Sequence, residues 1–261
     1  CCENLRYVRL KAILYGSCNL MIIKKHKDVG KPFKWKHSTG KIILWLVTWY
    51  CRYALSYRDL TEMALERGLK LERSTICRWV QEYAPEINKR IKPHLKMTCD
   101  SWKLDETYVK IKGKWHYLYR AIDKHGDTLD WMLSVHRNKK AAKRFFKKLL
   151  GNKHTVDPRV INVDKSPTFP PALAELKATN EAPQNTKLRA VKYLNNSMEN
   201  DHKSTKSKSR YRQWYQSFST ARNTLDGMEA MRMLKKGQVR NIGKNVAKQN
   251  SFVRSLFAIA A

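Results

Sequence analysis

The order of strand and helix signals after residue 100 restricts the fold of this chain more than any other feature. Three segments rich in β-forming residues follow one another with only short turns between them: 102–111, 114–122 and 128–135. Signals then alternate, with a basic amphipathic helix at 138–150, a buried strand at 159–163, a helix at 172–176, a strand at 188–194 and a helix through Glu199. Antiparallel strands followed by alternating strands and helices predict a mixed α/β layer fold with a five-stranded sheet.

Three short helical segments precede that region. Apolar residues recur at helical spacing in 42–50, and a second segment, 56–67, has Ser56 as its predicted N-cap. A third segment starts at Ser74, which we expect to cap it, and Pro85 lies near its end. The glycine-containing turn between the second and third segments is typical of a helix-turn-helix, so the sequence predicts a small all-α module of that type.

Two aspartates and one glutamate stand where these elements would present functional groups. Asp105 lies in mid-strand, where a charge is costly unless it is paired, bound to metal or at a cleft. Asp164 ends a predicted strand, the position at which open α/β sheets carry functional groups. Glu199 lies on the helix that follows the fifth strand. Acids from two strands and a helix can converge on Mg²⁺, which prefers oxygen ligands.

Each acid also has an ordinary structural interpretation. Asp105 could end a turn or form a salt bridge, Asp164 could cap the following helix, and Glu199 could be a surface acid. Four other carboxylates compete with them: Glu106, Asp123, Asp127 and Asp201. Spacing alone leaves these alternatives open.

The charge of the chain points to a polyanionic partner. Fifty-three Lys and Arg residues against 22 Asp and Glu give a formal net charge of +31. DNA, RNA or an anionic membrane would each suit such a surface, and nucleic acid is favoured. The apolar run at 42–50 is too short to span a bilayer, and the six scattered cysteines suggest reduced residues, so we expect a cytoplasmic protein that does not bind membranes.

Short strings along the chain resemble DDE transposases of the insertion-sequence-six family, which belong to small bacterial mobile elements. The resemblance covers about residues 31–240, and the order and spacing of the strings make it specific. The strings are PFKWKH at 32–37, WYCRY at 49–53, SYRDL at 56–60, STICRWV at 74–80, LDETYV at 104–109, YLYRAID at 117–123, NVDK at 162–165, YLNN at 193–196, ENDH at 199–202 and KKGQ at 235–238.

The resemblance implies a catalytic triad and a reaction. The family's three acids correspond to Asp105, Asp164 and Glu199, and its basic residue seven positions beyond the third acid corresponds to Lys206. An RNase H-like core would hold Mg²⁺ or Mn²⁺, with two ions expected. The enzyme would act as a homo-oligomer on double-stranded DNA, cleave at the terminal inverted repeats of its element, and join the freed 3′-hydroxyl to target DNA in replicative transposition.

The helix-turn-helix is expected to recognise the element ends. Side chains near the start of a recognition helix usually reach base edges, whereas neighbouring cations fix phosphates. Ile76, Trp79 and Val80 are expected in the core. The basic run at 203–212 is expected to line the DNA path. The predicted DNA-binding residues are Lys70, Arg73, Ser74, Thr75, Arg78, Lys203, Lys208 and Arg210.

These patterns suggest four regions: an appendage or translated upstream segment at 1–30, the helix-turn-helix domain at 31–98, the catalytic domain at 99–240 and a C-terminal tail at 241–261. One alternative function is a non-catalytic, sequence-specific DNA-binding protein, either an inactive transposase remnant or a regulator. Two others are a retroviral-type integrase, whose usual zinc module has no counterpart in the spacing of this sequence, and a basic RNA-binding protein.

Overall fold

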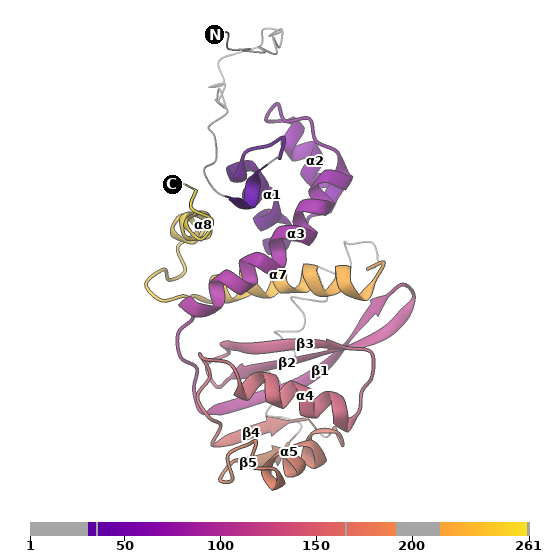
Figure 1. The fold of residues 1–261 in the computed structure, drawn as a ribbon, viewed down its shortest axis with the longest axis vertical. Coiled ribbons are helices and arrows are strands. Elements are labelled where there is room, and N and C mark those ends of the chain that lie inside the picture. The colour runs from indigo at the N-terminus through magenta and orange to yellow at the C-terminus, as the bar shows by residue number, and fades with distance from the viewer. Residues whose placement is uncertain (1–30, 35, 165, 192–214, 260–261) are drawn as a thin grey trace.

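The computed structural model describes residues 31–34, 36–164, 166–191 and 215–259, which form a helical part and a sheet part (Figure 1). The helical part contains α1 (Gly40–Arg52), α2 (Tyr57–Leu65), α3 (Arg73–Ile91) and α8 (Val246–Ser255), with short 3₁₀ turns at Lys31–Phe33 and Lys92–His94. The sheet part contains β1 (Ser101–Ile111), β2 (Lys114–Asp123), β3 (Thr128–Ser134), α4 (Lys139–Leu150), β4 (Val160–Val163), α5 (Phe169–Ala178) and β5 (Lys187–Ala190). Helix α7 (Phe218–Lys236) lies between the two parts (Figure 1).

The sheet has five strands in the order β3-β2-β1-β4-β5. The first three strands along the chain are antiparallel neighbours, while β4 and β5 run parallel to β1. This mixed sheet with flanking helices is the RNase H-like architecture that was predicted. Strand β5 begins at Lys187, close to the expected position, and ends at Ala190.

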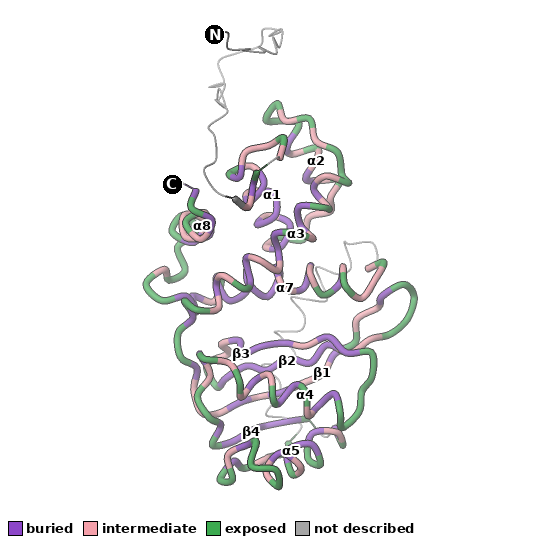
Figure 2. The backbone as a smooth tube through the Cα atoms, in the orientation of Figure 1, coloured by how far each residue is buried: buried purple, intermediate pink, exposed green. Residues whose placement is uncertain are grey.

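Side-chain alternation along β1 and β2 gives the sheet two different apolar faces. On one face Trp102, Leu104 and Tyr119 are buried against the inner sides of α4 and α5. On the other face Leu118 and the neighbouring strand residues are buried against α7, which contributes Leu225 and other apolar residues. The buried stretches of the central strands and of α7 are visible in Figure 2. Helices therefore cover both faces of the sheet, so apolar residues of either orientation on the central strands are buried.

The first three helices follow the predicted layout, with two corrections. Ser56 caps α2 in a reciprocal capping box with Asp59, and Gly68 adopts φ +73° in the turn that follows. Ser74, however, is not an N-cap: α3 begins at Arg73, and its capping position is Glu72, whose side chain makes no capping hydrogen bond. The third helix also continues past Pro85 to Ile91 instead of ending near it.

The continuation through Pro85 has a physical reason. A proline inside a helix leaves the carbonyl four residues earlier without its amide donor. That carbonyl belongs to Gln81, and the side-chain amide of Asn223 in α7 donates to it at 3.3 Å. Beyond the proline, Ile87 and Ile91 are fully buried, so tertiary packing favours further helix. The interface with α7 thus overrides the local stop signal.

Helices α7 and α8 complete the helical core. Met231 and Leu234 of α7 and Val253 of α8 belong to the same buried cluster as the apolar residues of α1 and α3. Gly227 of α7 lies so close to α1 that a Cβ atom at this position would be 2.5 Å from Cys51 Sγ. Residues 241–261, expected as a tail, therefore include a helix whose apolar side is part of the core.

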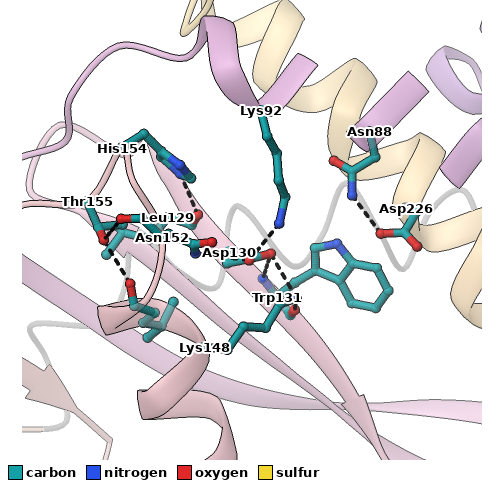
Figure 3. Close-up of polar contacts among 11 residues, drawn as sticks. Asn88, Lys92, Leu129, Asp130, Trp131, Lys148, Asn152, His154, Thr155 and Asp226 are labelled. Carbon is teal, nitrogen blue, oxygen red and sulfur yellow. Dashed lines mark hydrogen bonds and ion pairs between the residues drawn. The ribbon is translucent and has the colours of Figure 1, made fainter. Parts of the chain in front are cut away.

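A polar joint connects the helical part to the sheet (Figure 3). The Asp130 carboxylate of β3 is almost fully buried and accepts hydrogen bonds from Lys92, Lys148 and Asn152, each at 3.0 Å. Burial would raise the pKa of Asp130, but the charges of Lys148 and Lys92 outweigh it and leave the pKa lowered. The carboxylate is therefore ionised at neutral pH and ties the 3₁₀ turn after α3, and α4, to the same strand.

The end of α7 is fixed to the β2–β3 turn. Gln238 accepts from the Thr128 amide and donates to the Thr128 carbonyl, both at 3.0 Å, and Lys236 donates to the Gly126 carbonyl at 2.6 Å. The KKGQ string thus includes residues with a structural role. Within the described part of the chain, no helix is long and apolar enough to cross a membrane.

Candidate active site

Asp105 and Asp164 become neighbours through the pairing of β1 with β4. The two strands run parallel, and their last paired residues are Leu104 and Val163. Asp105 and Asp164 are the next residue of each strand, so the register continued by one position sets them side by side at the carboxyl end of β4. Adjacent strands lie about 4.8 Å apart, which is close enough for two carboxylates to share a cation.

The alternation of the strands also determines which way Asp105 faces. Leu104 and Trp102 point to the α4 and α5 side, so Asp105 points to the α7 side. Its Oδ1 accepts a hydrogen bond from the Glu106 amide at 2.8 Å, which orients the carboxylate. Asp105 is partly exposed and Asp164 is exposed, so solvent and substrate can reach both.

Arg120 is directly opposite Asp105 on β2. Its guanidinium donates to Glu229 of α7 at 2.9 Å, and the exposed fractions of the two side chains are 0% and 1%. Arg232 lies 3.7 Å from the same carboxylate. A buried ion pair therefore connects α7 to β2, the neighbour of the strand that carries Asp105.

Glu106 fixes the loop that carries Asp164. Its side chain points away from Asp105 and is 5% exposed. One carboxylate oxygen accepts from the Ser166 and Thr168 hydroxyls at 3.1 and 3.0 Å, and the other accepts from Arg137 at 2.7 Å. Partial burial lowers the pKa of Arg137, but the nearby Glu106 carboxylate outweighs this effect and raises the pKa. In the sequence Glu106 stands only as a rival acid. The Ser166 and Thr168 hydroxyls, two and four residues after Asp164, are its sequence signal for a structural contact.

The other two rival acids in the described chain lie at the β2–β3 turn. Asp123 is 1% exposed and accepts from the backbone amides of Cys99, His125 and Asp127, so it holds the β2–β3 turn together. Burial and the neighbouring Asp123 raise the pKa of Asp127. Both lie at the end of the sheet opposite to Asp164. Asp201 lies outside the described residues.

The remaining predicted site residues also lie outside the described residues: Glu199, Lys203, Lys206, Lys208 and Arg210. Among the residues that the structure does describe, no group of three or more His, Cys, Asp or Glu side chains could hold a metal ion. The donors present fit a hard cation nonetheless, because two accessible carboxylates at adjacent strand ends offer the oxygen ligands that Mg²⁺ and Mn²⁺ take.

The predicted DNA-reading residues gather at the start of α3. Arg73, Ser74 and Arg78 are exposed and Thr75 is partly exposed, with an Arg78–Thr75 hydrogen bond of 3.3 Å. Lys70, in the turn before the helix, is exposed as well. The predicted core residues Ile76, Trp79 and Val80 are buried, which confirms that prediction. The first two turns of α3 therefore present a polar, cationic face to solvent.

Comparison with known proteins identifies the family. A family model described as a DDE domain matches residues 99–238. The transposase for insertion sequence-like element IS431mec of Staphylococcus aureus is 41% identical over 211 residues, covering 80% of this chain and 91% of that protein. The transposase for insertion sequence element IS257 in transposon Tn4003 of the same organism matches with the same identity and coverage.

Among solved structures, the HTLV-2 integrase catalytic core domain is 13% identical, and the match covers 57% of this chain and 94% of that one with a TM-score of 0.39. The family match and the close relatives, not this loose likeness, establish the relationship. The alternative of a non-catalytic regulator is not favoured by them. The chain belongs to the DDE transposases of the insertion-sequence-six family, which are polynucleotidyl transferases.

Proposed function

We propose that this transposase cleaves DNA at the ends of an insertion sequence and joins the freed ends to target DNA, with Asp105, Asp164 and Glu199 as its metal ligands. The observation that carries the proposal is the adjacency of Asp105 and Asp164 on parallel strands, which follows from the β1–β4 register. Glu199, at the family's position for the third acid, completes the set in this proposal.

The chemistry consists of two phosphoryl transfers. In the first, a water oxygen bonds to phosphorus at the element end, and the bond to the 3′-oxygen breaks to leave a 3′-hydroxyl. In the second, that hydroxyl attacks a target phosphodiester and displaces another 3′-oxygen. Bound divalent ions, two in our proposal, would activate the attacking oxygen and stabilise the leaving one.

The protein residues have distinct roles in this proposal. The carboxylates of the triad hold the cations, and Lys206 binds a phosphate oxygen near the scissile bond. Glu106 acts as a positioning residue, because its bonds to Ser166 and Thr168 hold the loop after Asp164 against β1. Lys203, Lys208 and Arg210 are proposed to line the DNA path, and their positive charges suit the phosphate backbone.

Metal removal tests the reaction directly. The purified chain, incubated with DNA that carries its own element ends, is expected to nick and join that DNA with Mg²⁺ or Mn²⁺. Excess EDTA should abolish both products and leave binding to the ends in place, as measured by gel electrophoresis of end-labelled DNA. Binding without any metal-dependent cleavage would contradict the proposal and favour a non-catalytic DNA-binding protein.

We further propose that the first two turns of α3 read the terminal repeats. Ser74, Thr75 and Arg78 would contact bases, while Lys70 and Arg73 would contact phosphates. The residues at the start of α3 are exposed and carry positive charge, which supports the proposal. An arginine at such a position can contact guanine through two hydrogen bonds. Action as a homo-oligomer on two element ends, in the bacterial cytoplasm where the DNA resides, belongs to the same proposal.

Replacing Arg78 with Ala tests the recognition role. The change is expected to weaken binding to the element ends by about 10-fold and leave binding to unrelated duplexes within about twofold, because a bidentate base contact contributes roughly 1–3 kcal/mol. Fluorescence anisotropy on both DNAs measures the ratio. The matched control is Arg58→Ala, on the exposed side of α2, which should leave the ratio unchanged. An equal loss on both DNAs would assign Arg78 to phosphate contact alone.

A further inference from the structure

The hairpin formed by β1 and β2 extends beyond the rest of the sheet (Figure 1). Pairing of β1 with β4 ends at Leu104, and pairing of β2 with β3 begins only at Tyr117. The far part of the hairpin is thus a two-stranded ribbon. Its α7 side is occupied, because Ile111 and Val109 are packed in the cluster that contains Phe218.

The opposite side of the ribbon carries an exposed aromatic row. Tyr108 is opposite Tyr117, and Lys110 is opposite Trp115, so these four side chains share one face. Trp115 is 60% exposed and Tyr108 is 53% exposed, which is unusual for such large rings. The Tyr108 ring lies 6.1 Å from the Trp115 ring and 5.3 Å from the Tyr117 ring. We call this row, together with Lys110 and the two lysines at the tip of the hairpin, Lys112 and, on the side of Ile111, Lys114, the hairpin surface.

The charge of the hairpin surface indicates which class of partner it binds. Residues 107–118 contain three lysines and a histidine and no acidic residue. Lys112 and Lys114 are exposed at the tip, and the Lys110 ammonium lies 5.5 Å from the centre of the Trp115 ring. A second copy of this chain, with its net charge of +31, would be repelled by such a surface. A polyanion with flat apolar groups suits it instead.

We propose that the hairpin surface binds unpaired or terminal DNA bases, with the rings of Trp115 and Tyr108 against base faces and the tip lysines on phosphates. Rings and cations arranged in this way are the means by which proteins hold single-stranded nucleic acid. Base faces are hidden inside a continuous duplex and become accessible at frayed or cleaved ends. The inference rests on the proposed function, since DNA cleavage creates such ends. Tyr108 is three residues from Asp105 on the same strand but faces the other side, so the surface contacts DNA outside the cleavage centre.

The test compares two DNA probes that differ only in pairing. One is a short blunt duplex, and the other is the same duplex with a fork of unpaired thymines at one end. Binding of the full chain is measured by fluorescence anisotropy in EDTA and in an Asp105→Asn background, so that no cleavage occurs. Trp115→Ala is expected to weaken binding to the forked probe by about 10-fold and to the blunt probe by less than about twofold, in keeping with the contribution of a single base stack.

Conservative and distant variants complete the test. Trp115→Phe should retain most of the affinity for the fork. The double change Lys112→Ala and Lys114→Ala should weaken both complexes and reduce the slope of log K against log salt by about two. Lys153→Ala, an exposed lysine at the opposite end of the sheet, should change neither.

Three results would overturn the inference. Trp115→Ala could weaken binding to both probes equally, or it could weaken binding to neither. The third result is a change in the sedimentation of the DNA-free protein while DNA binding stays intact. The last would assign the surface to contact between copies of the chain. Because binding is measured without metal in a cleavage-deficient background, failure of the hairpin surface leaves the proposed cleavage reaction standing. Conversely, if the chain fails to cleave DNA with Mg²⁺, its binding to the two probes still tests the hairpin surface.

Discussion

Replacing Asp105 with Asn is expected to abolish both nicking and strand transfer while the protein still folds and binds the element ends. The amide has nearly the same shape as the carboxylate but lacks its charge, so it binds a divalent cation poorly. Metal-ion stabilisation of phosphoryl transfer contributes several kcal/mol, and its loss corresponds to a rate decrease of roughly 1,000-fold or more. Product formation from end-labelled DNA in Mg²⁺ measures the effect.

The matched control for this change is Asp157→Asn. Asp157 is an exposed acid in the loop before β4, at the end of that strand opposite to Asp164. This variant should cleave and join DNA at the unaltered rate, whereas Asp164→Asn should match Asp105→Asn. Strand transfer by Asp105→Asn within about 10-fold of the unaltered enzyme would remove Asp105 from the metal site, since that loss is worth only about 1.4 kcal/mol.

Replacing Glu229 with Ala is expected to lower the free energy of unfolding by about 3–5 kcal/mol, because it removes the carboxylate to which the fully buried Arg120 guanidinium donates. The exposed fractions of 0% for Arg120 and 1% for Glu229 leave water little access to take the place of the lost carboxylate. The double change Arg120→Met and Glu229→Leu should restore most of the loss, since an apolar pair of similar volume has no charge to desolvate. Urea titration followed by circular dichroism measures the unfolding midpoint and slope.

An exposed ion pair provides the comparison for Glu229. In the Arg58–Glu62 pair the exposed fractions are 71% and 62%, so Glu62→Ala should cost less than about 1 kcal/mol. If Glu229→Ala destabilised the protein as little as Glu62→Ala, the buried pair would contribute nothing to the attachment of α7 to the sheet. A double variant as unstable as Glu229→Ala alone would show that the loss arises from packing and not from the broken ion pair.

The sheet could be predicted from local patterns because its strands have strong and well-separated signals. The three segments between residues 102 and 135 combine β-forming residues with short turns, and Lys112 and Gly113 both adopt positive φ in the first turn. The order of strands and helices then restricted the topology to a few arrangements. The adjacency of Asp105 and Asp164, however, depends on the β1–β4 register, which no local pattern specifies.

Features that depend on tertiary contacts were missed. The passage of α3 through Pro85 requires Asn223, which is far away in the sequence, to bond the Gln81 carbonyl. The role of Glu106 depends on hydroxyls from a loop that reaches it only after β4 is in the sheet. Residues 241–261 lack a strong amphipathic pattern, and α8 is positioned by the core that it completes. The positions of Glu199 and Lys206 remain predictions.

The helical core combines residues that lie far apart in the chain, and this affects how the protein folds during synthesis. Gly40, at the start of α1, is so close to Ile259 that a Cβ atom there would lie 2.7 Å from its Cδ1 atom. Helix α3 leaves the ribosome early, whereas Met231, Leu234 and Val253, which complete its core, are translated much later. Any message truncated before α7 would therefore yield a chain in which α3 lacks the partners that complete its core, so incomplete products would not fold as the finished protein does.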